Sequence, residues 1–169
     1  FEISYWCGNK NLLVVTVSHR YYAYISRVIF YMLYSELHVC TSCRTAGSPR
    51  EPRENRPGFK LYQELRTLLN QSPLKRQVEV RPAECLSLCP RPCGISLSSV
   101  GKWSYLFGDQ KPRACARDIM ELVSLYLSTE DGLMPRQQRP NSLQTSVLGR
   151  VPPFIGKTDR YQQQPSHLE

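Results

Sequence analysis

The sequence has few of the groups on which enzymes and membrane proteins most often depend. It contains three histidines in 169 residues, and these are dispersed at His19, His38 and His167. It has no glycine-rich phosphate loop and no residue constellation typical of a hydrolase or transferase. Its apolar run from Tyr21 to Tyr34 is interrupted by Arg27 and is too short to cross a bilayer. These absences predict no catalytic residues, no enzyme activity and no membrane partner.

Acidic residues are also scarce. There are 14 Asp and Glu against 22 Lys and Arg, which gives a formal net charge of +8. This balance favours acidic partners. The basic residues are mostly arginines that are scattered over loops and the C-terminal segment, without interleaved stacking aromatics, so nucleic-acid binding is not expected. We find no clean secretory signal pattern, and we therefore expect a cytoplasmic protein.

Composition divides the chain into three parts. Residues 1–31 have no cap, turn or period that fits the later pattern, and the first methionine is Met32. We expect residues 1–31 to be a non-native or disordered extension, and the functional domain to span residues 32–132. Residues 133–169 are rich in Pro, Arg and Gln, which predicts an extended tail that partly wraps the domain.

Hydrophobic periodicity predicts four strands and two helices. Strands are expected over residues 37–39 and 78–80, and residues 95–97 and 103–107 form a hairpin whose turn contains Gly101. Asn55 and Asp109 are expected to cap the two helices. The first helix carries an apolar stripe of Leu61, Leu65, Leu68 and Leu69. The buried face of the second contains Cys115, Ile119, Leu122 and Tyr126.

This order predicts an α/β fold of the thioredoxin-like kind, a βαββα sheet with helices packed on it. The first two strands lead directly into the two cysteine groups, at Cys40 and at Cys85. If these strands are parallel, both groups emerge at the same end of the sheet. The topology therefore predicts one shared site.

The cysteines carry the strongest functional signal. Of seven in the chain, five form two tight groups, whereas Cys7 and Cys115 stand apart. The grouped cysteines are Cys40, Cys43, Cys85, Cys89 and Cys93. Thiolates are the ligands that iron–sulfur clusters and zinc prefer, and four are normally needed. Five grouped cysteines therefore predict a metal centre more readily than a set of ordinary buried thiols.

The spacing within and between the groups favours a cluster over zinc. Cys40 and Cys43 have a two-residue gap, but the three-residue gap from Cys85 to Cys89 is less usual for structural zinc. The separation between the groups is also much longer than in zinc ribbons. Cys43 leads into a long Pro-rich segment instead of directly into a helix, which argues against a CxxC thiol-redox enzyme.

Taken together, VCTSCR, ECLSLCPRPC, GKWSYLFGD and RVPP resemble a family of small bacterial proteins described only as predicted metal-binding. The wider pattern is similar to the thioredoxin-like [2Fe-2S] ferredoxins. The resemblance covers about residues 37–153, and it implies a [2Fe-2S] cluster. It places Cys40, Cys85 and Cys89 among the ligands, with Cys43 as the fourth and Cys93 as a spare or alternative ligand.

Three functions follow as expectations. The first is an electron carrier or cluster-bearing accessory protein that is steered to an acidic redox partner, as a monomer or a homodimer. The second is a zinc-stabilised protein-interaction module. The third is a thiol-redox protein that uses Cys40 and Cys43.

Overall fold

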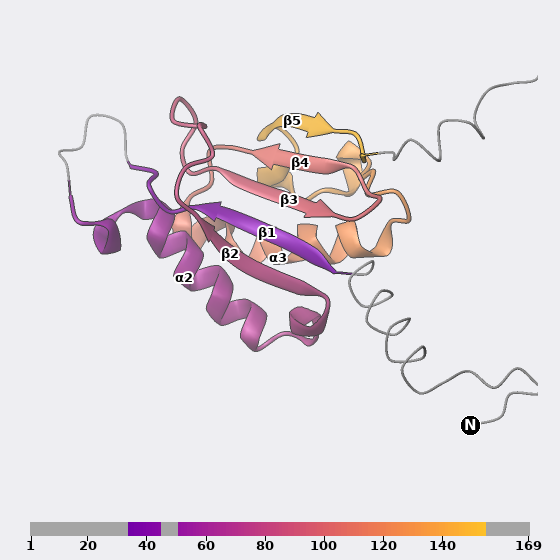
Figure 1. The fold of residues 1–169 in the computed structure, drawn as a ribbon, viewed down its shortest axis with the longest axis horizontal. Helices are drawn as coiled ribbons and strands as arrows, with labels where there is room; N and C mark the ends of the chain where they lie inside the picture. The colour runs from indigo at the N-terminus through magenta and orange to yellow at the C-terminus, as the bar shows by residue number, and fades with distance from the viewer. Residues whose placement is uncertain (1–33, 45–50, 155–169) are drawn as a thin grey trace, which may run out of the picture. The chain divides into compact units, whose positions relative to one another are not determined.

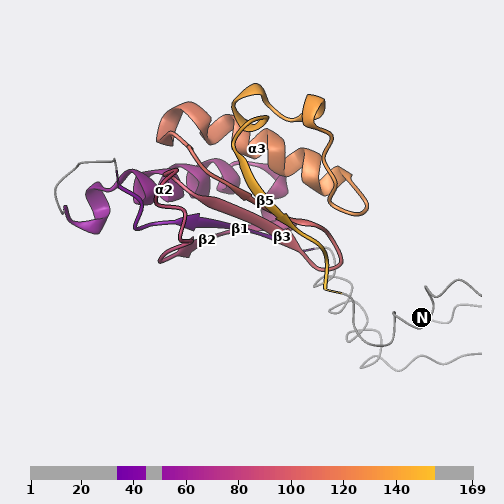
Figure 2. The same ribbon diagram turned by 90° about the horizontal axis from the view of Figure 1, so that it is seen from above.

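The computed structural model describes residues 34–44 and 51–154. Within these ranges, five strands form one sheet in the order β2-β1-β3-β4-β5 (Figure 1). Helices α2 and α3 pack side by side and cover one face of the sheet (Figure 2). The predicted extension over residues 1–31 lies outside the described residues.

The first strand–helix–strand unit is the centre of the fold. β1 (Ser35–Cys40) pairs in parallel with β2 (Val78–Ala83), and Cys40 lies opposite Ala83. The crossover is α2 (Pro57–Asn70), whose buried side chains include Leu61, Leu65 and Leu69 at helical spacing. The parallel pairing confirms that both cysteine groups leave the sheet at the same end.

The predicted hairpin forms the next two strands. β3 (Ile95–Ser99) pairs with both β1 and β4 (Ser104–Phe107) in antiparallel fashion. Gly101 has a φ of 72° in the turn, where a side chain would be strained. Tyr105 and Phe107 are buried with ring centroids 5.6 Å apart. These aromatic rings therefore pack in the core, as predicted.

Helix α3 (Pro112–Ser128) closes the βαββα order and confirms the thioredoxin-like fold class. Its buried side chains are Cys115, Ala116, Ile119, Leu122, Val123 and Tyr126. The predicted caps are wrong by one or two residues, because Arg56 and Lys111 occupy the N-cap positions. Asp109 has a positive φ of 59° and pairs instead with Arg91, with 2.7 Å between its Oδ2 and the arginine Nε.

A fifth strand that the sequence pattern did not predict lies at the edge of the sheet. β5 (Val147–Val151) pairs antiparallel with β4 across an irregularity at Leu106 and Phe107. Before it, the chain passes over the core, where Met134 and Leu143 are buried. Short 3-10 helices span Arg53–Asn55, Pro73–Arg76, Arg136–Gln138 and Asn141–Leu143.

Candidate metal centre

Cys40 and Cys43 lie where β1 ends, and the start of β3 holds both of them. The Cys40 amide donates to the Gly94 carbonyl at 3.0 Å. The Gly94 amide in turn donates to the Cys43 sulfur at 3.4 Å. Both cysteines are buried. The two-residue gap between them therefore places two thiols beside the backbone of a neighbouring strand.

The first turn of α2 packs directly against this pair. A Cβ added at Gly58 would lie 2.1 Å from the Cys40 carbonyl oxygen and 3.0 Å from the Cys43 Cβ. The Gly58 amide donates to the Cys43 carbonyl at 3.4 Å. Cys43 leads into the Pro-rich segment as predicted, and the start of α2 nevertheless lies against it.

Cys93 joins these two thiols from the other cysteine group. It is only 2% exposed, and backbone hydrogen bonds in both directions tie it to Gln110, at 3.2 and 3.1 Å. The Cys40 and Cys43 thiols, and the Cys43 and Cys93 thiols, lie close enough to shift one another's pKa. We call Cys40, Cys43 and Cys93 the buried trio. Three buried thiols from two distant parts of the sequence are thus neighbours.

The contacts within the buried trio shift its pKa values in different directions. The hydrogen bond with Cys43, together with burial, raises the pKa of Cys40 far above its usual range. The bond with Cys40 acts to lower the pKa of Cys43, but the bond with Cys93 and burial outweigh it and raise that pKa. The bond with Cys43 lowers the pKa of Cys93 despite its burial. Cys93 is therefore the member of the trio that most readily becomes a thiolate.

Cys85 and Cys89 differ from the trio in being exposed. The Cys85 sulfur accepts a hydrogen bond from the Ser87 amide at 3.3 Å. The loop that carries it touches the trio through backbone groups on either side of Cys85. The Cys40 thiol lies 3.8 Å from the Glu84 carbonyl oxygen and also accepts from the Leu86 amide. We call Cys85 and Cys89 the exposed pair.

The other candidate residues lie apart from these thiols. Cys115 is buried in α3, where the Lys111 amide lies 3.5 Å from its sulfur, as expected for a small core side chain. His38 lies on β1 with its Nε2 3.6 Å from a Glu36 carboxylate oxygen. Cys7, His19 and His167 lie outside the described residues.

Two supporting residues were not identified from the sequence. Thr41 is fully buried next to Cys40, donates to the Ala83 carbonyl at 3.0 Å and accepts from Arg53 Nε at 3.1 Å. Gly58 follows Pro57 in the first turn of α2. A glycine directly after an N1 proline is the one signal that could have indicated a close approach here.

The described residues supply the donor types that an iron–sulfur or zinc centre needs. Five thiols lie at one end of the sheet, and backbone amides already donate to the sulfurs of Cys40, Cys43 and Cys85. Such N–H···S bonds are the outer-shell contacts that stabilise bound thiolates. The trio thiols are linked in a row, however, and within residues 34–44 and 51–154 no three His, Cys, Asp or Glu side chains already surround a metal position. The residues thus fit such a centre in the type of donor atom that they supply.

Comparison with known protein families gives a match over most of the chain. Residues 37–153 match the model of a family described as "Protein of unknown function (DUF1636)". No curated protein matches the chain. In the described part of the chain, no helix combines the length and the apolar character that a bilayer crossing requires.

Among solved structures, the chain is similar to a thioredoxin-like [2Fe-2S] ferredoxin from Aquifex aeolicus. One structure of this ferredoxin is 19% identical in sequence and has a TM-score of 0.47. The match covers 73% of this chain and 98% of the ferredoxin chain. A second structure, of the wild-type ferredoxin, is 18% identical in sequence and has a TM-score of 0.45. The match covers 69% of this chain and 97% of the ferredoxin chain. At this distance, function has to be inferred from the residues of the chain itself.

Proposed function

The chain belongs to the DUF1636 family, whose function is unknown, and we propose that it holds a [2Fe-2S] cluster on four cysteines and acts as an electron carrier or cluster-bearing accessory protein. The observation that carries this proposal is the proximity of three buried thiols beside the loop of a fourth. Sulfur ligands and amide donors are the surroundings in which such clusters are held.

The proposed ligands are the buried trio and Cys85. Cys85 is preferred to Cys89 because the backbone on both sides of it contacts the Cys40 sulfur. Cys93 thereby takes the place that the sequence pattern gave to Cys89. The bound cluster would accept and pass one electron, and the chain would bury and orient the sulfurs and hydrogen-bond them through backbone amides.

No substrate site is needed for this role, and we propose that the protein is not an enzyme. Its partner would be an acidic redox protein, because the chain has a formal net charge of +8. The cytoplasmic location and the homodimer stay predictions.

Structural zinc is the second candidate, because four thiolates also satisfy zinc and a buried set of this kind contributes folding energy. A dithiol redox function is the third candidate, and the proximity of the Cys40 and Cys43 thiols is the observation that supports it. The three functions differ in bound metal and sulfide.

Anaerobic purification followed by iron, sulfide and zinc analysis tests the proposal. We expect about two iron and two sulfide per chain, the composition of a [2Fe-2S] cluster, with visible absorbance. A colourless protein that holds zinc and no sulfide would overturn it. Cys93→Ser and Cys89→Ser, made separately, test the ligand set: the first should remove the iron and the second should retain it.

A further inference from the structure

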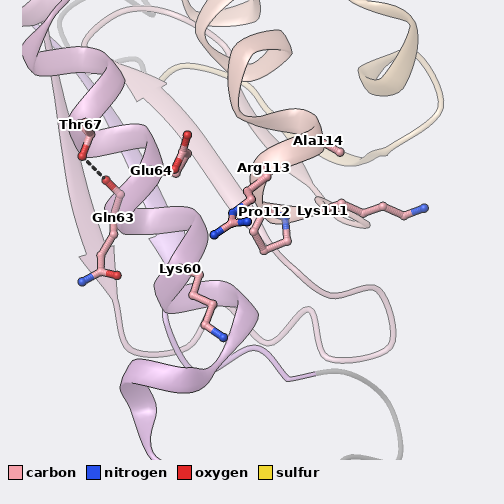
Figure 3. A pocket seen from close by; sticks show the side chains of 8 residues that line it. All are labelled: Lys60, Gln63, Glu64, Thr67, Lys111, Pro112, Arg113 and Ala114. Atoms are coloured by element: carbon pink, nitrogen blue, oxygen red, sulfur yellow. Dashed lines mark hydrogen bonds between the residues drawn. The ribbon is translucent and has the colours of Figure 1, made fainter.

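A basic groove lies between the two helices, close to the buried trio. It has a volume of about 680 Å³ and runs between the exposed side of α2 and the first turn of α3. Lys60 and Glu64 line it from α2, and Lys111 and Arg113 line it from the start of α3. Figure 3 shows that the Arg113 side chain extends toward α2, whereas Lys111 points away along the outer rim.

The charges in this groove are unbalanced. Three cations and a single carboxylate, that of Glu64, line it. Lys60, Lys111 and Arg113 are exposed, and within the described ranges none of them has an ion-pair partner. Lys111 is the N-cap residue of α3 and Arg113 lies in its first turn, which contains no acidic residue. Cations at the positive end of a helix destabilise it, so an anionic partner would relieve this repulsion.

The groove and the buried trio share their supporting elements. Lys111 directly follows Gln110, whose backbone is hydrogen-bonded to Cys93 in both directions. Lys60 lies two residues after Gly58, whose Cα packs against the Cys40 carbonyl. The elements that hold the buried trio therefore also present these cations.

Resting on the proposed function, we propose that this groove is the docking surface for an acidic segment of the redox partner protein. Lys60 and Arg113 would contact the carboxylates of that segment, and Lys111 would attract it from the rim. Glu64 would oppose binding and limit the affinity, which suits a carrier that must release its partner. Attraction between exposed charges is screened by salt, so binding should weaken as ionic strength rises.

Binding of a fluorescein-labelled deca-glutamate peptide to the full chain, measured by fluorescence anisotropy at low ionic strength, tests this surface. The double change Lys60→Gln and Arg113→Gln should weaken binding by about tenfold, since each exposed charge contributes modestly. Glu64→Gln should tighten binding severalfold. A gain in affinity is not the result expected from a damaged groove, so this variant complements the double change.

The matched control is Lys75→Gln with Arg76→Gln, which removes the same two charges from the exposed segment before β2, at the other end of the sheet. Its affinity should stay within about twofold of the wild-type value, because distant exposed charges are largely screened. Equal weakening by both double variants, weakening by neither, or no binding by the wild-type chain would each overturn the docking surface. Iron content is measured on the same samples: a chain that binds the peptide but lacks iron would count against the cluster alone.

Discussion

The buried trio and the exposed pair lie at the same end of one sheet, yet different forces hold them. Each member of the trio is fixed by a neighbouring element: Cys40 and Cys43 by Gly94 and α2, and Cys93 by Gln110. Cys85 and Cys89 are exposed, and the Cys85 sulfur has a local contact, from the Ser87 amide. The fold itself thus places three of the proposed ligands, whereas a bound metal would have to fix the fourth.

The free-energy cost of binding a metal would also differ between the trio and the exposed pair. Burying a thiol that must ionise is unfavourable, and the pKa values of Cys40 and Cys43 are raised accordingly. Binding of the proposed metal centre would release those protons, so deprotonation would lower the metal affinity of the trio. The exposed pair avoids this cost but must be ordered when the metal binds.

The largest expected effect comes from removing one member of the trio. Cys40→Ser should abolish bound iron almost completely, because a hydroxyl is a poor ligand for soft metal centres. Cys115→Ser is the matched control, since Cys115 is equally buried but lies in the helical core. Iron analysis and visible absorbance check both variants. Retention of a full complement of iron by Cys40→Ser would contradict the ligand assignment.

Alkylation rates compare the two groups directly. In the metal-free protein, iodoacetamide should modify Cys85 and Cys89 at least about tenfold faster than the trio, because exposure controls access to a thiol. Mass spectrometry of the peptides measures each rate. With the metal bound, Cys85 should become protected while Cys89 stays reactive. Protection of Cys89 with Cys85 left reactive would exchange their proposed roles.

Gly58→Ala tests how tightly α2 holds the trio. The new Cβ would lie 2.1 Å from the Cys40 carbonyl oxygen, so α2 has to shift. We expect a loss of about 1–3 kcal/mol in the free energy of unfolding, as for overpacking in a core. Denaturant unfolding measures it. Gly149→Ala, which meets nothing within 4 Å, should change stability much less.

A smaller loss is expected from Thr41→Val, which keeps the shape of the buried side chain. It removes the hydroxyl that donates to the Ala83 carbonyl and accepts from Arg53. The Ala83 carbonyl still accepts from the backbone amide of residue 41 at 2.8 Å. The expected loss is therefore about 1 kcal/mol, the net value of one hydrogen bond. An unchanged unfolding midpoint would show that Arg53 does not stabilise this turn.

The smallest effect is expected from Arg91→Gln, in the loop that joins the exposed pair to Cys93. Arg91 pairs with Asp109 on the protein surface. Exposed ion pairs contribute about 0.2–1 kcal/mol and are screened by salt. The difference from the wild-type stability should therefore disappear at high ionic strength. A difference that persists in high salt would show that Arg91 acts by packing.

Much of the fold could be predicted from local pattern. The two helical stripes, the hairpin turn at Gly101 and the alternating strands all depend on periodicity and turn chemistry. The strand β5 could not be predicted in this way, because Gly149 interrupts its alternation of apolar and polar residues. Pairing with β4 is what makes this segment a strand. The helix caps were missed because Arg56 and Lys111, which are poor capping residues, hold those positions.

The convergence of the cysteines followed from the parallel pairing of β1 and β2. The division of the cysteines into a buried trio and an exposed pair could not be predicted from that pairing. The burial of Cys93 depends on backbone hydrogen bonds to Gln110, well beyond the cysteine loop. The approach of α2 to Cys43 likewise depends on how the chain returns after the Pro-rich segment. Both are tertiary contacts that spacing alone does not encode.

The number of electrons that one chain accepts tests the central claim most directly. A coulometric titration of the anaerobically purified protein should show reversible uptake of one electron per chain with bleaching of the visible band, as for a [2Fe-2S] cluster. Zinc accepts no electrons, and a disulfide accepts two. Uptake of zero or two electrons per chain would contradict the cluster and favour the zinc or the dithiol function respectively.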